Sequence, residues 1–311
     1  MRIAMNVGGD VLGAPVPPIQ IAADAQTAEE AGFPAVWTTH VARGTDTLAA
    51  IAVAGTQTRS IELGIGVVPT YPRHPHALAQ TAATVQSLCG GRFTLGIGSS
   101  HRPVIETALG LEYASPAAHM REYLQVLTAL LSTGEVSHTG RFYNVEASFT
   151  VVGSTAPSIL VAALGPRMVE VAGTYADGTV TWMTGARGIG EQIAPGLAKA
   201  AEAAGRPAPR IVVGVPVAVC DDVDAGRAAA LATFARYDTL DNYRAQYDRE
   251  GSSGVVDQTI YGPEETVLRR LTELRDAGAT ELWAVPFGVG PDPAAGIART
   301  VTFFASLAPE L

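Results

Sequence analysis

Short apolar runs alternate along the chain with longer segments in which apolar residues recur every three or four positions. The short runs lack alternating charged residues, which is typical of parallel strands that are covered on both faces. The longer segments have the spacing of amphipathic helices. The runs that predict strands are 2–7, 35–39, 61–68, 93–98, 159–164, 178–183, 211–219 and 281–287.

A helix is predicted after each of these strands. The first begins after Pro17-Pro18 and ends at Gly32, which suits a left-handed cap. Eight strand–helix units in a chain of 311 residues predict an α/β fold, a (β/α)₈ TIM barrel that forms one domain over residues 1–311. A doubly wound sheet is the competing architecture, but eight such units would make that sheet unusually wide.

Two segments depart from the regular alternation. Residues 135–152 hold two β-rich runs around Gly140, which predicts a small inserted hairpin. Residues 222–250 are charged and partly helical, and the GSSG sequence at 251–254 predicts a flexible break after this insertion. Pro216 and Pro286 lie inside apolar runs, so we expect both near strand ends or bulges, where no ladder hydrogen bond is lost.

Composition excludes several classes of protein. Lys and Arg number 21 against 30 Asp and Glu, and no basic stripe indicates a nucleic-acid surface. No apolar run reaches the roughly 18 residues that a membrane span needs, and the N-terminus turns polar too early for a secretory signal. The two cysteines, Cys89 and Cys220, have no metal-site spacing. We therefore expect an acidic cytoplasmic protein without a bound metal.

The carboxyl ends of barrel strands carry the chemistry of such folds. Four of the six histidines, at positions 40, 74, 76 and 101, follow predicted strands at this end. Histidine is the usual proton carrier near neutral pH, although polar residues are also ordinary in exposed loops. The tryptophans Trp37, Trp182 and Trp283 lie on predicted strands, where filling the barrel core is their expected role.

Two glycine-containing segments are candidates for ligand binding. Gly96 and Gly98 lack the third glycine and the acidic residue of a dinucleotide fingerprint, so a close turn is the better interpretation. Residues 164–167 combine a glycine, a proline suited to the first helical position, and an arginine. Such a helix N-terminus attracts anions, but the same pattern is an ordinary loop-to-helix junction. The residues alone leave this choice open.

Five segments together resemble the luciferase-like monooxygenase superfamily, specifically its branch of oxidoreductases that use the deazaflavin coenzyme F420. They are residues 28–37, 61–101, 119–131, 161–185 and 276–287. The resemblance runs nearly end to end and implies the same barrel, usually a homodimer, with the cofactor ring in the barrel mouth.

The resemblance also implies which residues contact the cofactor. The strand-three backbone bends against the ring at Gly66 and Val67, typically through a non-prolyl cis peptide. The backbone of the turn at 164–166 binds the cofactor phosphate. The full implied set is Gly66, Val67, Thr70, Gly98, Ser99, Ser100, Leu164, Gly165, Pro166, Arg167, Met183 and Thr184.

The implied activity is hydride transfer between F420 and a small organic substrate, with His40 or His101 carrying the accompanying proton. Arg73, Arg102 or Arg167 would supply charge for the anionic tail of F420. His101 stands where members that oxidise sugar phosphates have a glutamate, which argues against that substrate. A reduced-FMN monooxygenase and a non-catalytic flavin-binding barrel are the alternatives, because fold and phosphate turn are common to all three. Neither the substrate nor the direction of hydride transfer is determined.

Overall fold

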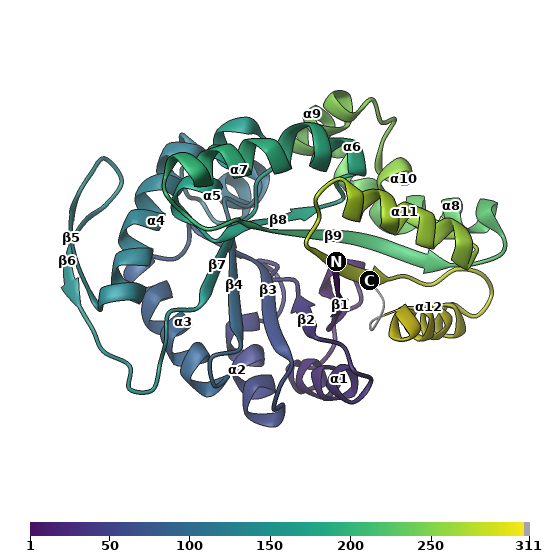
Figure 1. The fold of residues 1–311 in the computed structure, drawn as a ribbon, viewed down its shortest axis with the longest axis horizontal. Coiled ribbons are helices and arrows are strands. Elements are labelled where there is room, and N and C mark those ends of the chain that lie inside the picture. The colour runs from purple at the N-terminus through teal and green to yellow at the C-terminus, as the bar shows by residue number, and fades with distance from the viewer. Residues whose placement is uncertain (308–311) are drawn as a thin grey trace.

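The computed structural model describes residues 1–307 and contains a closed barrel of eight parallel strands, as predicted (Figure 1). Each strand pairs with the next, and β8 closes the ring by pairing with β9. In barrel order the strands are β1 (Arg2–Asn6), β2 (Ala35–Thr38), β3 (Glu62–Pro69), β4 (Phe93–Gly98), β7 (Ser158–Val161), β8 (Gly178–Trp182), β9 (Arg210–Val219) and β11 (Glu281–Pro286).

Helices surround the barrel, and the main hydrophobic core lies between them and the outward-facing side chains of the strands. None of the helices within residues 1–307 is long and apolar enough to cross a membrane. The principal helices are α1 (Pro18–Glu30), α2 (Thr47–Gln57), α3 (Pro75–Leu88), α4 (Pro116–Thr133), α5 (Pro166–Tyr175), α7 (Ala194–Ala203), α11 (Glu264–Asp276) and α12 (Pro293–Leu307).

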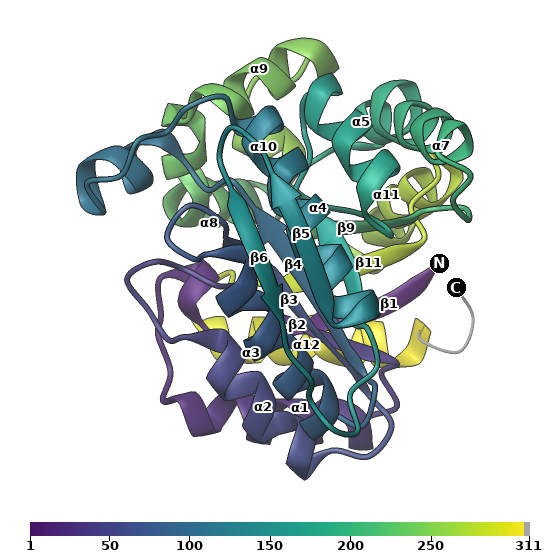
Figure 2. The ribbon, with the colours of Figure 1, turned by 90° about the vertical axis from the view of Figure 1, so that its left-hand side faces the viewer.

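The predicted hairpin is present as β5 (Glu135–Thr139) and β6 (Asn144–Ser148), which pair antiparallel outside the barrel (Figure 2). The carboxylate of Glu122 on α4 binds the turn between β5 and β6. That carboxylate accepts hydrogen bonds from the backbone N–H groups of Arg141, Phe142 and Tyr143. The hairpin is therefore anchored to the helix layer rather than to the barrel sheet.

One strand prediction needs correction. Pro286 is the last residue of β11, as expected, but Pro216 lies well inside β9. On one side of β9, pairing with β8 ends at Gly214 and pairing with the short strand β10 (Ile260–Gly262) begins at Val217. Pro216 falls in the gap between these two neighbours, so its missing N–H costs no ladder hydrogen bond there.

The insertion after β9 folds over the carboxyl ends of the strands. It comprises α8 (Val223–Phe234), α9 (Asp241–Glu250) and α10 (Val255–Gln258), which Figure 1 shows grouped together near the ends of β8 and β9. Phe234, Tyr243 and Tyr247 from the insertion form one buried cluster with Met183 and Phe287 from the strand ends. The insertion thus supplies one wall of the barrel mouth.

The opposite end of the barrel holds a buried ion network. Arg210 Nη2 lies 2.8 Å from Glu62 Oε1 and 2.9 Å from Glu281 Oε2. Trp37 Nε1 donates to Glu281 at 2.7 Å, and the Thr94 hydroxyl donates to Glu62 at 2.6 Å. Burial by itself raises the pKa of Glu62, but the charge of Arg210 and these hydrogen bonds hold that pKa below its ordinary value.

Candidate functional site

The implied cofactor residues lie near the carboxyl ends of, or directly after, four strands that are neighbours in the barrel: β3, β4, β7 and β8. The N–H of Thr70 donates to the carbonyl of Gly98 at 2.9 Å, and the N–H of Ala162 donates to Ile97 at 2.8 Å. These bonds join the end of β3 to that of β4, and β4 to β7. The rim formed by these strand ends therefore brings together segments that are far apart in sequence.

The bend in β3 is where the sequence analysis expected it. The peptide bond between Gly66 and Val67 is cis, and the register with β4 shifts between Ile65 and Val68. A Cβ at Gly96 would lie 2.2 Å from the Ile65 carbonyl oxygen, and one at Gly98 would lie 2.6 Å from Val67 Cγ2. The glycines of β4 thus permit the close approach of the β3 backbone, which favours the close-turn interpretation of this segment.

Three tryptophan side chains form a row of neighbouring rings that runs from the barrel interior to the mouth, in the order Trp37, Trp283 and Trp182. The ring centroids of Trp37 and Trp283 are 5.8 Å apart, and those of Trp283 and Trp182 are 5.6 Å apart. Trp37 and Trp283 are buried in the core, as predicted, whereas Trp182 is half-buried. Trp283 Nε1 donates to Asn6 Oδ1 at 3.2 Å, but the buried Trp182 Nε1 has no partner among residues 1–307. The mouth therefore contains a hydrogen-bond donor that the described protein does not use.

His40 and His101 both stand half-buried at the rim. His40 Nδ1 lies 2.9 Å from the Thr47 hydroxyl, and the His101 ring centroid lies 5.9 Å from that of Tyr243. Burial lowers the pKa of His101, partly opposed by a hydrogen bond with Asn242. Burial also lowers the pKa of His40, partly opposed by the charge of Asp46. Both imidazoles are therefore neutral at pH 7 and can accept a proton.

The other two rim histidines belong to the helix layer. His74 caps α3, its Nδ1 accepting from the N–H of His76 at 3.2 Å, and its ring packs edge-on to Tyr143 of the hairpin segment. His76 packs edge-on to Phe149. Two of the four histidines that follow predicted strands, His74 and His76, therefore pack against residues of the hairpin segment.

The two remaining rim turns are held by α9. Arg249 Nη2 donates to the carbonyl of Leu164 at 3.1 Å. Gln246 Nε2 donates to the Met183 carbonyl and to the Thr184 hydroxyl, both at 2.9 Å. Met183 has a φ of 53°, an unusual backbone for a non-glycine residue, and this hydrogen bond supports it. The turns after β7 and β8 are therefore positioned by one helix of the insertion.

The sequence analysis did not identify these α9 residues. Their signal was nevertheless present, because Tyr243, Gln246, Tyr247 and Glu250 have helical spacing and all are buried. Glu250 accepts hydrogen bonds from the N–H of Gly185 and from Gln246, and burial raises the pKa of its carboxyl group. The sequence predicted only a charged, partly helical insertion over residues 222–250, and one face of its helix α9 supports the rim.

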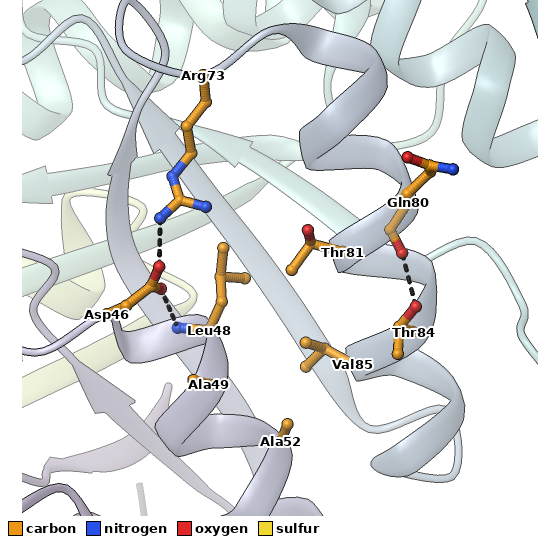
Figure 3. Close-up of a pocket in the computed structure, with 9 residues that line it drawn as sticks. All are labelled: Asp46, Leu48, Ala49, Ala52, Arg73, Gln80, Thr81, Thr84 and Val85. Carbon is orange, nitrogen blue, oxygen red and sulfur yellow. Dashed lines mark hydrogen bonds and ion pairs between the residues drawn. The ribbon is translucent and has the colours of Figure 1, made fainter.

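The three arginines expected to supply charge for the cofactor tail, Arg73, Arg102 and Arg167, lie in different surroundings. Arg73 reaches across a shallow groove of about 400 Å³ between α2 and α3, where its Nη2 lies 2.5 Å from Asp46 Oδ2 (Figure 3). Arg102 is paired with Glu106 and stacks over Tyr113. Arg167 is exposed and lines a groove between α4 and α5. Two of the three thus already have carboxylate partners.

Comparisons with known proteins agree with this architecture. The family model described as luciferase-like monooxygenase matches residues 2–281. An F420-dependent hydroxymycolic acid dehydrogenase of Mycobacterium tuberculosis is 30% identical over 289 residues, covering 88% of this chain and 73% of that protein. A 5,10-methylenetetrahydromethanopterin reductase of Archaeoglobus fulgidus is 26% identical over 297 residues, covering 85% and 88%.

A solved structure of an F420-dependent secondary alcohol dehydrogenase, in complex with an F420–acetone adduct, superposes with a TM-score of 0.76. It is 18% identical and covers 99% of this chain and 98% of that chain, a likeness that shows the fold. The chain belongs to the luciferase-like monooxygenase family and is an oxidoreductase of this class.

Proposed function

We propose that this protein is an F420-dependent oxidoreductase that transfers hydride between the deazaflavin and an alcohol or ketone. The observation that carries the proposal is the rim, where the ends of β3, β4, β7 and β8 gather the segments that the family resemblance implies for the cofactor. A relative at 30% identity that is named for F420-dependent activity supports this choice of cofactor over FMN.

The rim suits a flat, phosphorylated molecule with several hydrogen-bond acceptors. The bent β3 backbone at Val67 and the half-buried Trp182 provide apolar surface, and Gly98 leaves the neighbouring strand without a side chain. The Trp182 Nε1 and Thr39 Oγ1 atoms are buried without a partner in the described chain. Buried polar groups in native proteins are normally hydrogen-bonded, so these atoms fit a bound ligand.

The bound deazaflavin would supply a carbon centre that accepts or donates hydride. In the oxidation of an alcohol, the C–H bond breaks with its electron pair, the carbonyl double bond forms, and the hydroxyl proton must leave. A neutral imidazole at His101 or His40 is the acceptor for that proton. The lowered pKa of each histidine keeps the imidazole unprotonated, and the aromatic wall of Tyr243 limits access of water to His101.

Equilibrium titration tests the cofactor assignment directly. Purified protein is mixed with F420 or with FMN, and binding is followed by the fluorescence of each cofactor. We expect saturable binding of F420 with higher affinity than FMN, and loss of the F420 absorbance when 2-propanol is added. Tight binding of FMN without binding of F420 would instead support the monooxygenase. Binding of either cofactor without turnover of any alcohol or ketone would support the non-catalytic barrel.

The role of His101 is tested by His101→Ala. Loss of a positioned proton carrier slows turnover by about 10²- to 10⁴-fold, while the F420 dissociation constant stays close to the wild-type value. Because burial lowers the pKa of His101, alcohol oxidation by the wild type should fall only below pH 6.5, and the variant should lack this acid limb. His76→Ala, at a half-buried histidine that packs against Phe149 after the hairpin, is the matched control. Unchanged turnover in His101→Ala would remove this residue from the reaction.

A further inference from the structure

We propose that Arg249, on helix α9 of the insertion, binds the cofactor phosphate at the turn formed by residues 164–166. This inference rests on the proposed function, in which a phosphorylated cofactor occupies the rim. Its test is built so that the two proposals fail separately.

The Arg249 side chain is half-buried, and only some of its guanidinium N–H donors have hydrogen-bond partners. Its Nη2 donates to the Leu164 carbonyl at 3.1 Å, which fixes the group over the turn after β7. Its Nε is buried and has no hydrogen-bond partner among residues 1–307. A planar guanidinium presents several donors in a fixed fork, so one edge is held by the protein and another donor remains for an acceptor.

The charge of Arg249 is only partly matched, because it acts on the neighbouring Glu250 carboxylate, whose pKa it lowers against the effect of burial. Within the described chain, no carboxylate forms an ion pair with it, in contrast to Arg73 with Asp46 and Arg102 with Glu106. The adjacent carboxylate of Glu250 is occupied by Gln246, Gln258 and the Gly185 N–H. A partly buried cation is costly unless an anion accompanies it, and a phosphate at the turn would provide one.

The turn itself supplies matching donors. Helix α5 begins after Gly165, which has no side-chain cap, and a Cβ at this position would meet no atom within 4 Å. Pro166 has no N–H and Met168 donates its own to the Gly165 carbonyl, so the N–H of Arg167 and the helix dipole are what the first turn of α5 offers to an anion.

Arg249 and Gln246 are one turn apart on α9 and reach the turns after β7 and β8 respectively. Arg167, which the sequence analysis offered for the phosphate, is exposed and lines the outer groove between α4 and α5. The geometry therefore assigns the phosphate to the arginine of the insertion, which lies 85 residues after Leu164 in the chain.

The experiment compares Arg249→Met, Arg249→Lys and the control Arg244→Met, at an exposed arginine of the same helix, with two ligand pairs. The pairs are FMN with riboflavin, which differ by the phosphate alone, and F420 with 8-hydroxy-5-deazariboflavin, which lacks both the phosphate and the anionic tail, so the FMN pair isolates the phosphate. We expect Arg249→Met to weaken the phosphorylated member by about 10- to 100-fold, the range of a hydrogen bond to a charged group. The phosphate-free member should be unaffected, Arg249→Lys should fall between, and Arg244→Met should resemble the wild type.

Each alternative outcome is decisive. Equal weakening of both members of a pair, or no weakening, overturns the assignment to Arg249. If the wild type binds FMN but not F420, the proposed function fails, while selective weakening of FMN by Arg249→Met still supports the inference. If the wild type binds none of the four ligands, both proposals fail. If Arg249→Met does not fold, Arg249→Lys takes its place and should bind the phosphorylated ligands more weakly than the wild type does. High salt should also reduce the preference of the wild type for the phosphorylated member of each pair.

Discussion

The two ends of the barrel differ in how completely their buried polar groups are hydrogen-bonded. At the lower end, Arg210, Glu62 and Glu281 satisfy one another, and Thr94 and Trp37 complete the network. At the mouth, polar atoms of Trp182, Thr39 and Arg249 are buried without partners in the described chain.

This difference separates stability from function within one fold. A closed network leaves no donor or acceptor for a ligand, whereas the unpaired atoms of the mouth have a cost that a bound molecule would remove. The same contrast is general for such barrels, whose upper face carries chemistry and whose lower face carries stability. Substitutions at the lower end should therefore change folding, and substitutions at the rim should change binding.

The largest expected effect is at Glu281, whose side chain is 1% exposed. Glu281→Gln removes the charge that faces Arg210, and breaking a buried pair in this way costs about 3–5 kcal/mol of unfolding free energy. Urea denaturation measures this loss. Glu273→Gln, in a surface pair with Arg269, should change stability by less than about 1 kcal/mol. A loss at Glu281 as small as that at Glu273 would contradict the assigned role of the network.

A smaller effect is expected where β4 and β3 meet. Gly96→Ala places a methyl group 2.2 Å from the Ile65 carbonyl oxygen, so the two strands must separate. Overpacking of this kind costs about 1–3 kcal/mol, measured by urea denaturation, and should also weaken F420 because the bent β3 backbone moves. Gly165→Ala has open space around it and is the control for stability. Wild-type stability in Gly96→Ala would show that the strand contact is not tight.

The smallest effect near neutral pH concerns His119, which stacks on Tyr71 behind the rim and is 4% exposed. Burial lowers the pKa of His119 to about 4. The unfolded chain therefore binds this proton near pH 6.5 and the folded protein does not, so stability is retained above pH 6.5 and falls as the pH drops from 6.5 to about 4.

Thermal melting across this range tests the sign. The pH dependence should flatten in His119→Phe, which keeps an aromatic ring against Tyr71 but cannot titrate. His76→Gln, at a half-buried position away from Tyr71, is the control and should keep the wild-type slope. If His119→Phe loses stability in acid as steeply as the wild type, the acid-sensitive group lies elsewhere.

Local patterns predicted the eight strands because each is a compact apolar run followed by a helix with its own start and stop signals. They failed at Pro216, which was expected near a strand end or a bulge. Proline is expected near strand ends because it removes a ladder hydrogen bond. Whether that bond is lost at Pro216 depends on where the neighbouring strand β8 ends and where β10 begins. The pattern in one strand cannot contain that information.

The same distinction applies to the site. Sequence by itself determined the barrel, the glycines that let β3 approach β4, and the segments that follow each strand, because all of these depend on local spacing and side-chain size. Only the tertiary structure decided which histidines stay at the rim and which arginine lies over the turn at 164–166. Those outcomes depend on how the insertion packs across the strand ends, through contacts between residues that are distant along the chain.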